Sequence, residues 1–194
     1  MSPGASEPSP GPSSDAREQT QAAVLVPLLP AASDVEPPNV VLTRRRADLR
    51  RHAGEISFPG GRRDPGDADL SATALREAHE EIGLEPAGVE LIGELPAIST
   101  FATNYLIHPF VGVIAPGQQW QLSPREVDVV LELPLRALHE SKTRARLERR
   151  GISFETDAYV LDGHLIWGAT FRILANLIER LREGGLEGRP SLTF

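Results

Sequence analysis

The sequence of 194 residues is long enough for one globular domain with appended segments, and its hydrophobic fraction of 40% is ordinary for a soluble protein. It contains no cysteine, which excludes disulfides, thiolate metal sites and cysteine nucleophiles. The formal net charge of −7 argues against general nucleic-acid binding, and no apolar run approaches the roughly 20 residues that cross a bilayer. We therefore expect a cytoplasmic protein with neither a nucleic-acid nor a membrane partner.

The two ends of the chain differ in composition from its middle. Residues 1–18 are rich in Ser, Pro and Gly and cannot bury enough apolar surface to offset the entropy of ordering, which predicts a disordered tail that is not a signal peptide. Residues 19–183 carry the apolar patterns of one folded domain. Residues 184–194 are expected to form a loose C-terminal tail.

Short apolar runs predict strands along this domain. The run AAVLVPLL at 22–29 is nearly continuous, which predicts a strand that is buried on both faces. Pro109 interrupts the run at 105–114, which predicts an edge strand or a bulge. The pair Asp162–Gly163 predicts the turn of a hairpin over 154–167. Further strands are expected at 40–43, around Ile56 and Phe58, at 89–95 and at 127–133.

Two segments have the spacing of amphipathic helices. The first covers about 71–82, with Asp69 or Ser71 as its N-cap and Gly83 as the glycine that ends it. The second runs from 168 to about 182, and its apolar stripe comprises Phe171, Leu174, Leu177, Ile178 and Leu181. A short helix is expected over 134–139, and the basic run 143–150 is expected to be a loop. These elements predict an α+β fold with a mixed sheet between helices.

One face of the first helix carries Glu77, Glu80 and Glu81, because residues three and four apart lie on one side of a helix. Like charges at this spacing repel by a few tenths of a kcal/mol per pair. Carboxylates are hard oxygen donors that suit Mg²⁺ or Mn²⁺. From this spacing alone, a metal site and a solvated acidic face both stay open.

A dense group of cationic residues lies upstream in this otherwise acidic chain. Local positive charge of this kind indicates an anion site, most simply for phosphate, although a solvated surface loop is the alternative. The group leads into a predicted turn at Gly60 and Gly61, whose backbone amides could approach phosphate oxygens. Together with a metal ion and a glutamate base, it suggests that water attacks a phosphoanhydride. The group comprises Arg44, Arg45, Arg46, Arg50, Arg51 and His52.

The acidic helix and the loop before it resemble the Nudix box, G-x5-E-x7-R-E-U-x-E-E-x-G-U, in which U is apolar. Gly61, Asp67 and the run REAHEEIGL at 76–84 take its positions. Asp67 stands where the motif has glutamate, and one extra residue separates it from Arg76. The resemblance implies an α/β/α sandwich built on a mixed sheet. It also implies hydrolysis, dependent on Mg²⁺ or Mn²⁺, of a nucleoside diphosphate linked to another group.

A second stretch resembles a motif of the coenzyme A pyrophosphatase branch, L-L-T-x-R-[SA]-x3-R-x3-G-x3-F-P-G-G. Residues 42–45, Arg50, Gly54 and 58–61 match it, whereas Val41 and Arg46 depart from it. The run WGAT at 167–170 is also similar to that branch. The branch implies cleavage of coenzyme A to 3′,5′-ADP and 4′-phosphopantetheine. It makes the following residues candidates for binding the 3′-phosphate or the pyrophosphate of such a substrate: Arg44, Arg45, Arg50, Arg51, Gly60 and Gly61.

The resemblance also implies roles for the remaining residues. Glu77 and Glu81 become metal ligands, Glu80 a further ligand or a water-holder, and Arg76 a group that orients these carboxylates. Glu126, in the run SPREV before a strand, is the candidate general base. A Nudix hydrolase of ADP-ribose or NADH is the first alternative, and a non-catalytic Nudix ligand-binding module is the second. A monomer or a small homo-oligomer is expected.

Overall fold

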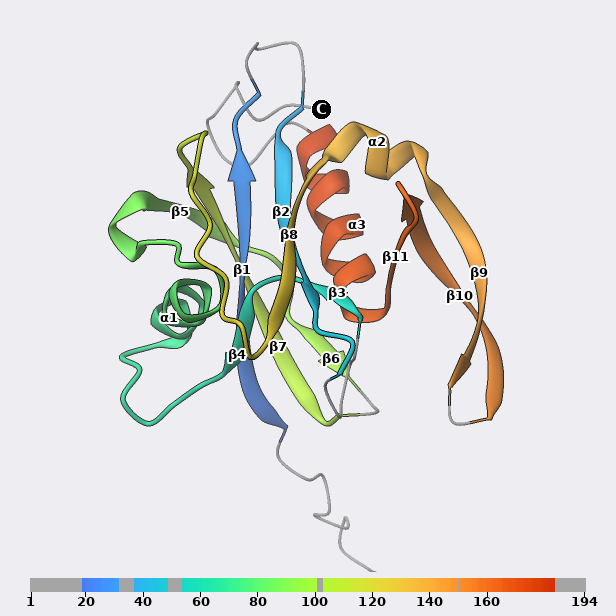
Figure 1. Cartoon of the computed structure of the whole chain (residues 1–194), viewed down its shortest axis with the longest axis horizontal. Helices are drawn as coiled ribbons and strands as arrows, with labels where there is room; N and C mark the ends of the chain where they lie inside the picture. The colour runs from blue at the N-terminus through green and yellow to red at the C-terminus, as the bar shows by residue number, and fades with distance from the viewer. Residues whose placement is uncertain (1–18, 32–36, 49–53, 101–102, 150, 184–194) are drawn as a thin grey trace, which may run out of the picture.

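The computed structural model describes residues 19–31, 37–48, 54–100, 103–149 and 151–183 (Figure 1). The tails predicted at 1–18 and 184–194 lie outside the described residues, as do the candidate ligands Arg50 and Arg51. Among the helices that are described, none is long and apolar enough to cross a membrane.

The described strands include eight that form one mixed sheet. Their central order is β3-β2-β1-β7-β5, while β4 pairs with β1, β6 with β7 and β8 with β2. β1 and β7 run parallel, and the other pairs are antiparallel. The strands are β1 (Thr20–Leu29), β2 (Asn39–Arg45), β3 (Ile56–Ser57), β4 (Gly60–Arg62), β5 (Val89–Glu94), β6 (Ile98–Thr100), β7 (Tyr105–Ile114) and β8 (Val127–Pro134).

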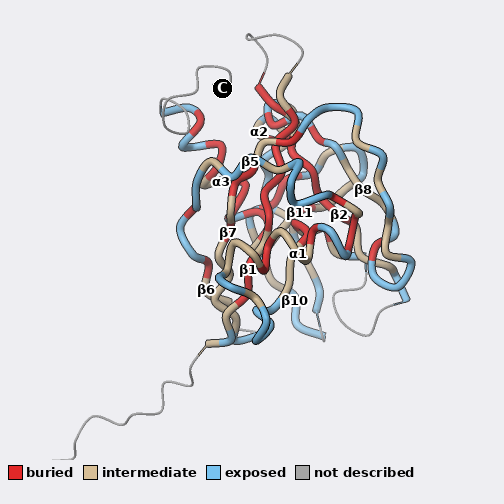
Figure 2. Tube along the Cα trace, turned by 90° about the vertical axis from the view of Figure 1, so that its left-hand side faces the viewer, coloured by how far each residue is buried: buried red, intermediate tan, exposed pale blue. Residues whose placement is uncertain are grey.

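Helices cover both faces of this sheet, so the predicted α/β/α sandwich is confirmed. Helix α1 (Leu70–Ile82) packs on one face, and α3 (Gly168–Glu183) and α2 (Leu135–Glu140) pack on the other (Figure 1). β1 supplies both cores, because Leu25 packs with α1 whereas Val26 and Leu28 pack with α3. Figure 2 shows this strand buried inside the molecule. The prediction of a strand buried on both faces is therefore confirmed.

The structure contains a second, three-stranded antiparallel sheet, in which the hairpin predicted over 154–167 is confirmed and the third strand is new. Its order is β11-β10-β9, built from β9 (Lys142–Arg149), β10 (Ile152–Leu161) and β11 (His164–Trp167). The turn at Asp162 and Gly163 is confirmed, with both residues at positive φ. The loop predicted over 143–150 is wrong, because β9 pairs with β10 along its whole length.

Two further predictions about strands need correction. β7 is an interior strand, so the edge position predicted from Pro109 is wrong. Pro109 lies where the neighbouring chain passes from β5 to β6, and its carbonyl accepts a hydrogen bond from the Leu95 amide at 2.9 Å. The hydrogen-bond ladder on this edge of β7 is therefore interrupted at Pro109, which has no N–H to donate. The turn predicted at Gly60 and Gly61 is strand β4, which pairs with β1.

Candidate active site

Helix α1 is fixed at both ends by capping residues. The Asp69 side chain accepts a hydrogen bond from the Ala72 amide at 2.8 Å, so Asp69 is the N-cap. Gly83 ends the helix in the left-handed region, with φ of 70°. Ala78 and Ile82 pack toward β1, which leaves the carboxylate face turned toward the ends of β2 and β8.

The three glutamates of α1 differ strongly in exposure. The Glu81 side chain is 5% exposed, that of Glu77 is 18% exposed and that of Glu80 is 57% exposed. Burial raises the pKa of Glu81 to about 8, while Arg45 acts in the opposite direction. Burial also raises the pKa of Glu77, and Arg76 opposes that shift. A carboxylate that is desolvated in this way favours a cation beside it.

Arg45 reaches this helix from the end of β2. Alternation along β2 puts Val41 in the core beneath α1, and Arg45 lies on the same side. A register shift between Arg44 and Arg45 interrupts the pairing with β8. The Arg45 guanidinium lies 3.8 Å from a Glu81 oxygen and 3.6 Å from a Glu126 oxygen. The structure therefore brings together predicted residues from β2, α1 and the loop before β8.

The other described arginines of the cationic group have separate partners. Arg44, on the opposite face of β2, donates to Asp128 at 2.6 Å and 3.0 Å. Arg46 pairs with Asp48 and donates to the Pro124 carbonyl at 2.8 Å. Within the described residues, the group is therefore divided between two faces of β2 and does not form one continuous patch.

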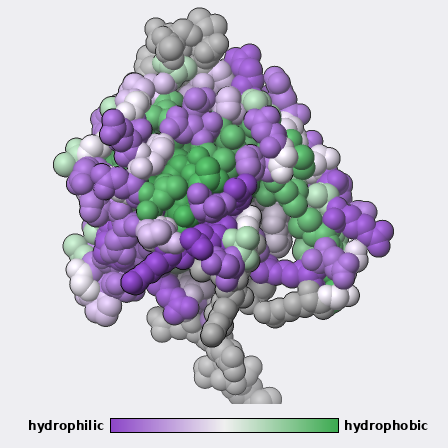
Figure 3. Space-filling model, viewed as in Figure 1, coloured by the Kyte–Doolittle hydropathy of each residue, from purple (hydrophilic) through white to green (hydrophobic). Residues whose placement is uncertain are grey.

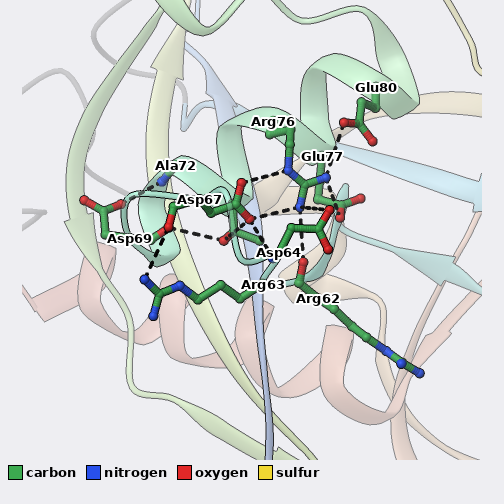
Figure 4. Close-up of polar contacts among 10 residues, drawn as sticks. Arg62, Arg63, Asp64, Asp67, Asp69, Ala72, Arg76, Glu77 and Glu80 are labelled. Atoms are coloured by element: carbon green, nitrogen blue, oxygen red, sulfur yellow. Dashed lines mark hydrogen bonds and ion pairs between the residues drawn. The ribbon is translucent and has the colours of Figure 1, made fainter.

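Arg76 ties the loop before α1 to the carboxylate face (Figure 4). Its guanidinium contacts Asp67 at 2.9 Å, Glu77 at 3.0 Å and Glu80 at 3.3 Å, and it also donates to the Arg62 carbonyl. It therefore restricts the position of the Glu77 carboxylate. The contact with Asp67 joins the two halves of the motif despite the extra residue between them.

Asp67 is held by more than its contact with Arg76. Its carboxylate also accepts hydrogen bonds from the Thr73 hydroxyl at 2.8 Å and the Asp64 amide at 2.9 Å. Arg76 and these donors hold the pKa of the Asp67 carboxyl well below its usual range. Asp67 therefore has a structural role, because it links the loop before α1 to Thr73 and Arg76 of the helix.

Gly60 and Gly61 lie in close contact with their neighbours, and at Gly60 the neighbour is backbone. A Cβ on Gly61 would lie 2.3 Å from a Glu77 oxygen, and one on Gly60 would lie 2.4 Å from the Ala23 carbonyl. A hydrogen bond from the Gly60 amide partly opposes the rise in the pKa of Glu81. Strand β4 therefore passes directly beneath the carboxylate face of α1.

The loop before β8 docks on the C-terminal end of α1, an arrangement that the sequence did not predict. The Gln121 amide donates to the Ile82 carbonyl at 3.0 Å, and the Ser123 amide donates to the Glu81 carbonyl at 2.8 Å. The Glu126 amide in turn donates to the Ser123 carbonyl at 3.1 Å. These bonds satisfy carbonyls that a helix end leaves free. They also fix the position of Glu126 relative to Glu81.

Replacing Gly83 with Ala is expected to lower both stability and turnover. The backbone there has positive φ, and a Cβ would lie 2.6 Å from the Gln121 Cβ. We expect a loss of about 1–2 kcal/mol in the free energy of unfolding, measured by urea denaturation, together with a fall in kcat. Gly88→Ala is the matched control, since nothing lies within 4 Å of a Cβ there. Equal stability of the two variants would contradict the docking role of Gly83.

The donor set fits a hard divalent cation. Glu81 and Glu126 place two carboxylates beside Arg45, and Glu81 interacts electrostatically with both Glu126 and Glu77. Oxygen donors with net negative charge suit Mg²⁺ or Mn²⁺. Across the residues that the structure describes, no three acidic or histidine side chains already form a metal cage. Arg45 lies against Glu81 and Glu126, and Arg76 lies against Glu77.

Comparisons with known proteins place the chain in a family. Residues 19–153 match the NUDIX domain family. The chain is 40% identical over 161 residues to a protein of Salmonella paratyphi B named "Uncharacterized Nudix hydrolase NudL", covering 82% of this chain and 81% of that protein.

Solved structures are similar in fold. The NUDIX domain of Shewanella oneidensis NrtR, complexed with ADP ribose, has a TM-score of 0.53 at 17% identity, covering 84% of this chain and 89% of that chain. A MutT/nudix family protein from Enterococcus faecalis has a TM-score of 0.56 at 14% identity, covering 90% of this chain and 66% of that chain.

Proposed function

Because this chain belongs to the Nudix hydrolase family, whose members act on nucleoside diphosphate derivatives, we propose that its substrate is coenzyme A or a derivative of it. The proposed products are 3′,5′-ADP and 4′-phosphopantetheine. The observation that carries the proposal is the position of Arg45. This residue belongs to the motif typical of the coenzyme A branch, and it lies against Glu81 and Glu126.

The proposed metal ligands are Glu77 and Glu81, with Glu80 as a further ligand or a holder of water. Mg²⁺ or Mn²⁺ at these carboxylates would supply neutralisation of the pyrophosphate charge. Arg76 keeps Glu77 in place through its 3.0 Å contact. Since the Glu77 side chain is only 18% exposed, a fixed rotamer is consistent with a ligand held before substrate arrives.

Glu126 is the proposed general base, which accepts a proton on its carboxylate from the attacking water. Its side chain is half-exposed, so water reaches it, and its backbone is fixed to α1 through Ser123. The Arg45 guanidinium lies 3.6 Å from this carboxylate. An exposed glutamate with no fixed backbone would lack this geometry.

The arginines are the proposed anion-binding groups. Arg45 is on the α1 side of β2 and is the candidate for the pyrophosphate. Arg44 lies on the other side with Asp128, and we assign it, with Arg50 and Arg51, to the 3′-phosphate. Gly60 and Gly61 contribute backbone that runs close beneath Glu77.

The test is hydrolysis in ¹⁸O-labelled water with Mg²⁺, offered separately with coenzyme A, dephospho-coenzyme A, ADP-ribose and NADH. Mass spectrometry of the products reports both the preferred substrate and the phosphorus that is attacked. We expect coenzyme A to have the highest kcat/KM and dephospho-coenzyme A a clearly lower one. Glu126→Gln should lower kcat by about 10²–10⁴-fold in the same assay. Preference for ADP-ribose or NADH would refute the substrate, and absence of any turnover would indicate a ligand-binding module.

A further inference from the structure

The contacts of Arg45 differ in kind from those of the neighbouring arginines. Its ion pairs with Glu81 and Glu126 measure 3.8 Å and 3.6 Å, both longer than a hydrogen bond. Its Nε is buried and, within the described part of the chain, has no hydrogen-bond partner. By contrast, Arg44 makes two hydrogen bonds to Asp128. Charge rather than directed hydrogen bonds therefore holds the Arg45 side chain where it is.

The backbone of Arg45 is anchored, although its side chain is not. Its amide donates to the Glu55 carbonyl at 3.0 Å, and its carbonyl accepts from the Gly54 amide at 3.1 Å. A fixed Cα and a long side chain without directed bonds leave the guanidinium free to change rotamer at low cost. The Arg45 side chain is 27% exposed, so it has access to the solvent side of the site.

The carboxylates need a positive charge nearby. Glu81 is almost fully buried, and an ionised carboxylate that is desolvated without a partner is costly. Arg45 supplies that charge in this structure. A divalent ion bound by Glu81 would make the charge of Arg45 unnecessary there, and the two cations would repel each other at such short range.

We propose that Arg45 is the internal counter-cation of Glu81 and Glu126, which competes with the divalent ion for Glu81 and turns to the substrate's phosphates when the ion binds. The inference rests on the proposed metal site and goes beyond it, because it gives one arginine two successive partners. Arg45 is then a positioning residue before the ion binds and a substrate contact afterwards. Binding of the ion and of the phosphates is coupled through it.

The direct test is Mn²⁺ affinity of the metal-free full-length protein without substrate, measured by titration with EPR detection of free Mn²⁺. Arg45→Gln is expected to bind Mn²⁺ at least about tenfold more tightly than wild type, because a competing positive charge has been removed. Arg45→Lys keeps the charge and should bind like wild type. Arg44→Gln is the matched control, since Arg44 faces away with Asp128, and its Mn²⁺ affinity should be unchanged.

A second measurement keeps the test valid if Arg45→Gln is unstable. The rise in melting temperature on adding Mn²⁺ should be larger for this variant than for wild type, because tighter binding stabilises the folded state more. Unchanged or weaker Mn²⁺ binding by Arg45→Gln would overturn the counter-cation role. If wild type itself shows no Mn²⁺ binding that Glu81→Gln abolishes, the proposed metal site fails instead.

Discussion

Glu81→Gln is expected to lower kcat at least about 1,000-fold without unfolding the protein. Glutamine has nearly the same shape, so the packing beneath α1 should be kept, but it is a far weaker ligand for a hard cation than a carboxylate. The measurement is steady-state hydrolysis with Mg²⁺, together with circular dichroism to verify the fold. Unchanged turnover would refute the metal role of Glu81.

The same variant should be at least as stable as wild type when no metal is present. Because the pKa of Glu81 is raised to about 8, ionisation of this group lowers the stability of the folded state. The loss develops as the pH rises from the ordinary pKa of a glutamate toward 8. Glutamine does not ionise, so melting temperatures of the two proteins should diverge in favour of the variant over that range. Glu80→Gln is the matched control, since the Glu80 side chain is 57% exposed and should show no such difference.

Arg76→Ala is expected to cause the largest loss of stability among the single changes considered. It would leave the Asp67 carboxylate, which is 6% exposed, without its cation, and it would free Glu77 as well. We expect a loss of about 3 kcal/mol in the free energy of unfolding. For a domain of this size that corresponds to a fall of roughly 6–12 °C in melting temperature by calorimetry.

Acid provides an independent test of the cause. The stabilisation from the ionised Asp67 is present above its ordinary pKa and is lost as the pH falls toward its lowered value in the folded state. The difference between wild type and Arg76→Ala should therefore shrink in acid. Arg63→Ala is the matched control, because Arg63 donates to carbonyls of the same loop but is exposed. An equal loss in both variants would show that the Asp67 pair is not the source.

The parts of the fold that the sequence predicts correctly depend on local patterns. Helix α1 follows from an apolar stripe between Asp69 and Gly83, which cap its two ends. β1 follows from an apolar run too continuous for a half-exposed strand. In both elements, packing against neighbouring elements favours the same secondary structure as the local sequence does.

The many charged residues of β9 favour a loop over a strand in the sequence. Its residues do alternate, because Thr143, Ala145 and Leu147 share one side of the strand. Leu147 on that side pairs with Phe154 of β10. A period of two was therefore present, although it was weak against so many arginines. The interior position of β7 could not be predicted from Pro109, because the gap between β5 and β6 that accommodates it depends on strand pairing.

The sequence names candidate site residues but does not predict how they pair. Alternation along β2 would have separated Arg44 from Arg45, had the strand been extended to that point. The docking of Gln121 and Ser123 on α1 depends on free carbonyls at a helix end, which are backbone groups that any sequence shares. The Asp67–Arg76 contact depends on how the loop between these two residues curves. The motif alone therefore could not show whether the extra residue prevents that contact.

The pairing of β1 with β7 has a consequence for how the chain reaches its native state. β1 is the first strand of the domain, yet its parallel partner β7 begins only at Tyr105. Likewise, β2 pairs with β8, which ends at Pro134. Non-local pairing of this kind slows folding and leaves early segments without partners during synthesis. The run AAVLVPLL can pair with β2 and β4 early, but its other edge must stay open on the ribosome until β7 has been made. We expect this stretch to be where a chaperone binds and where aggregation of incomplete chains begins.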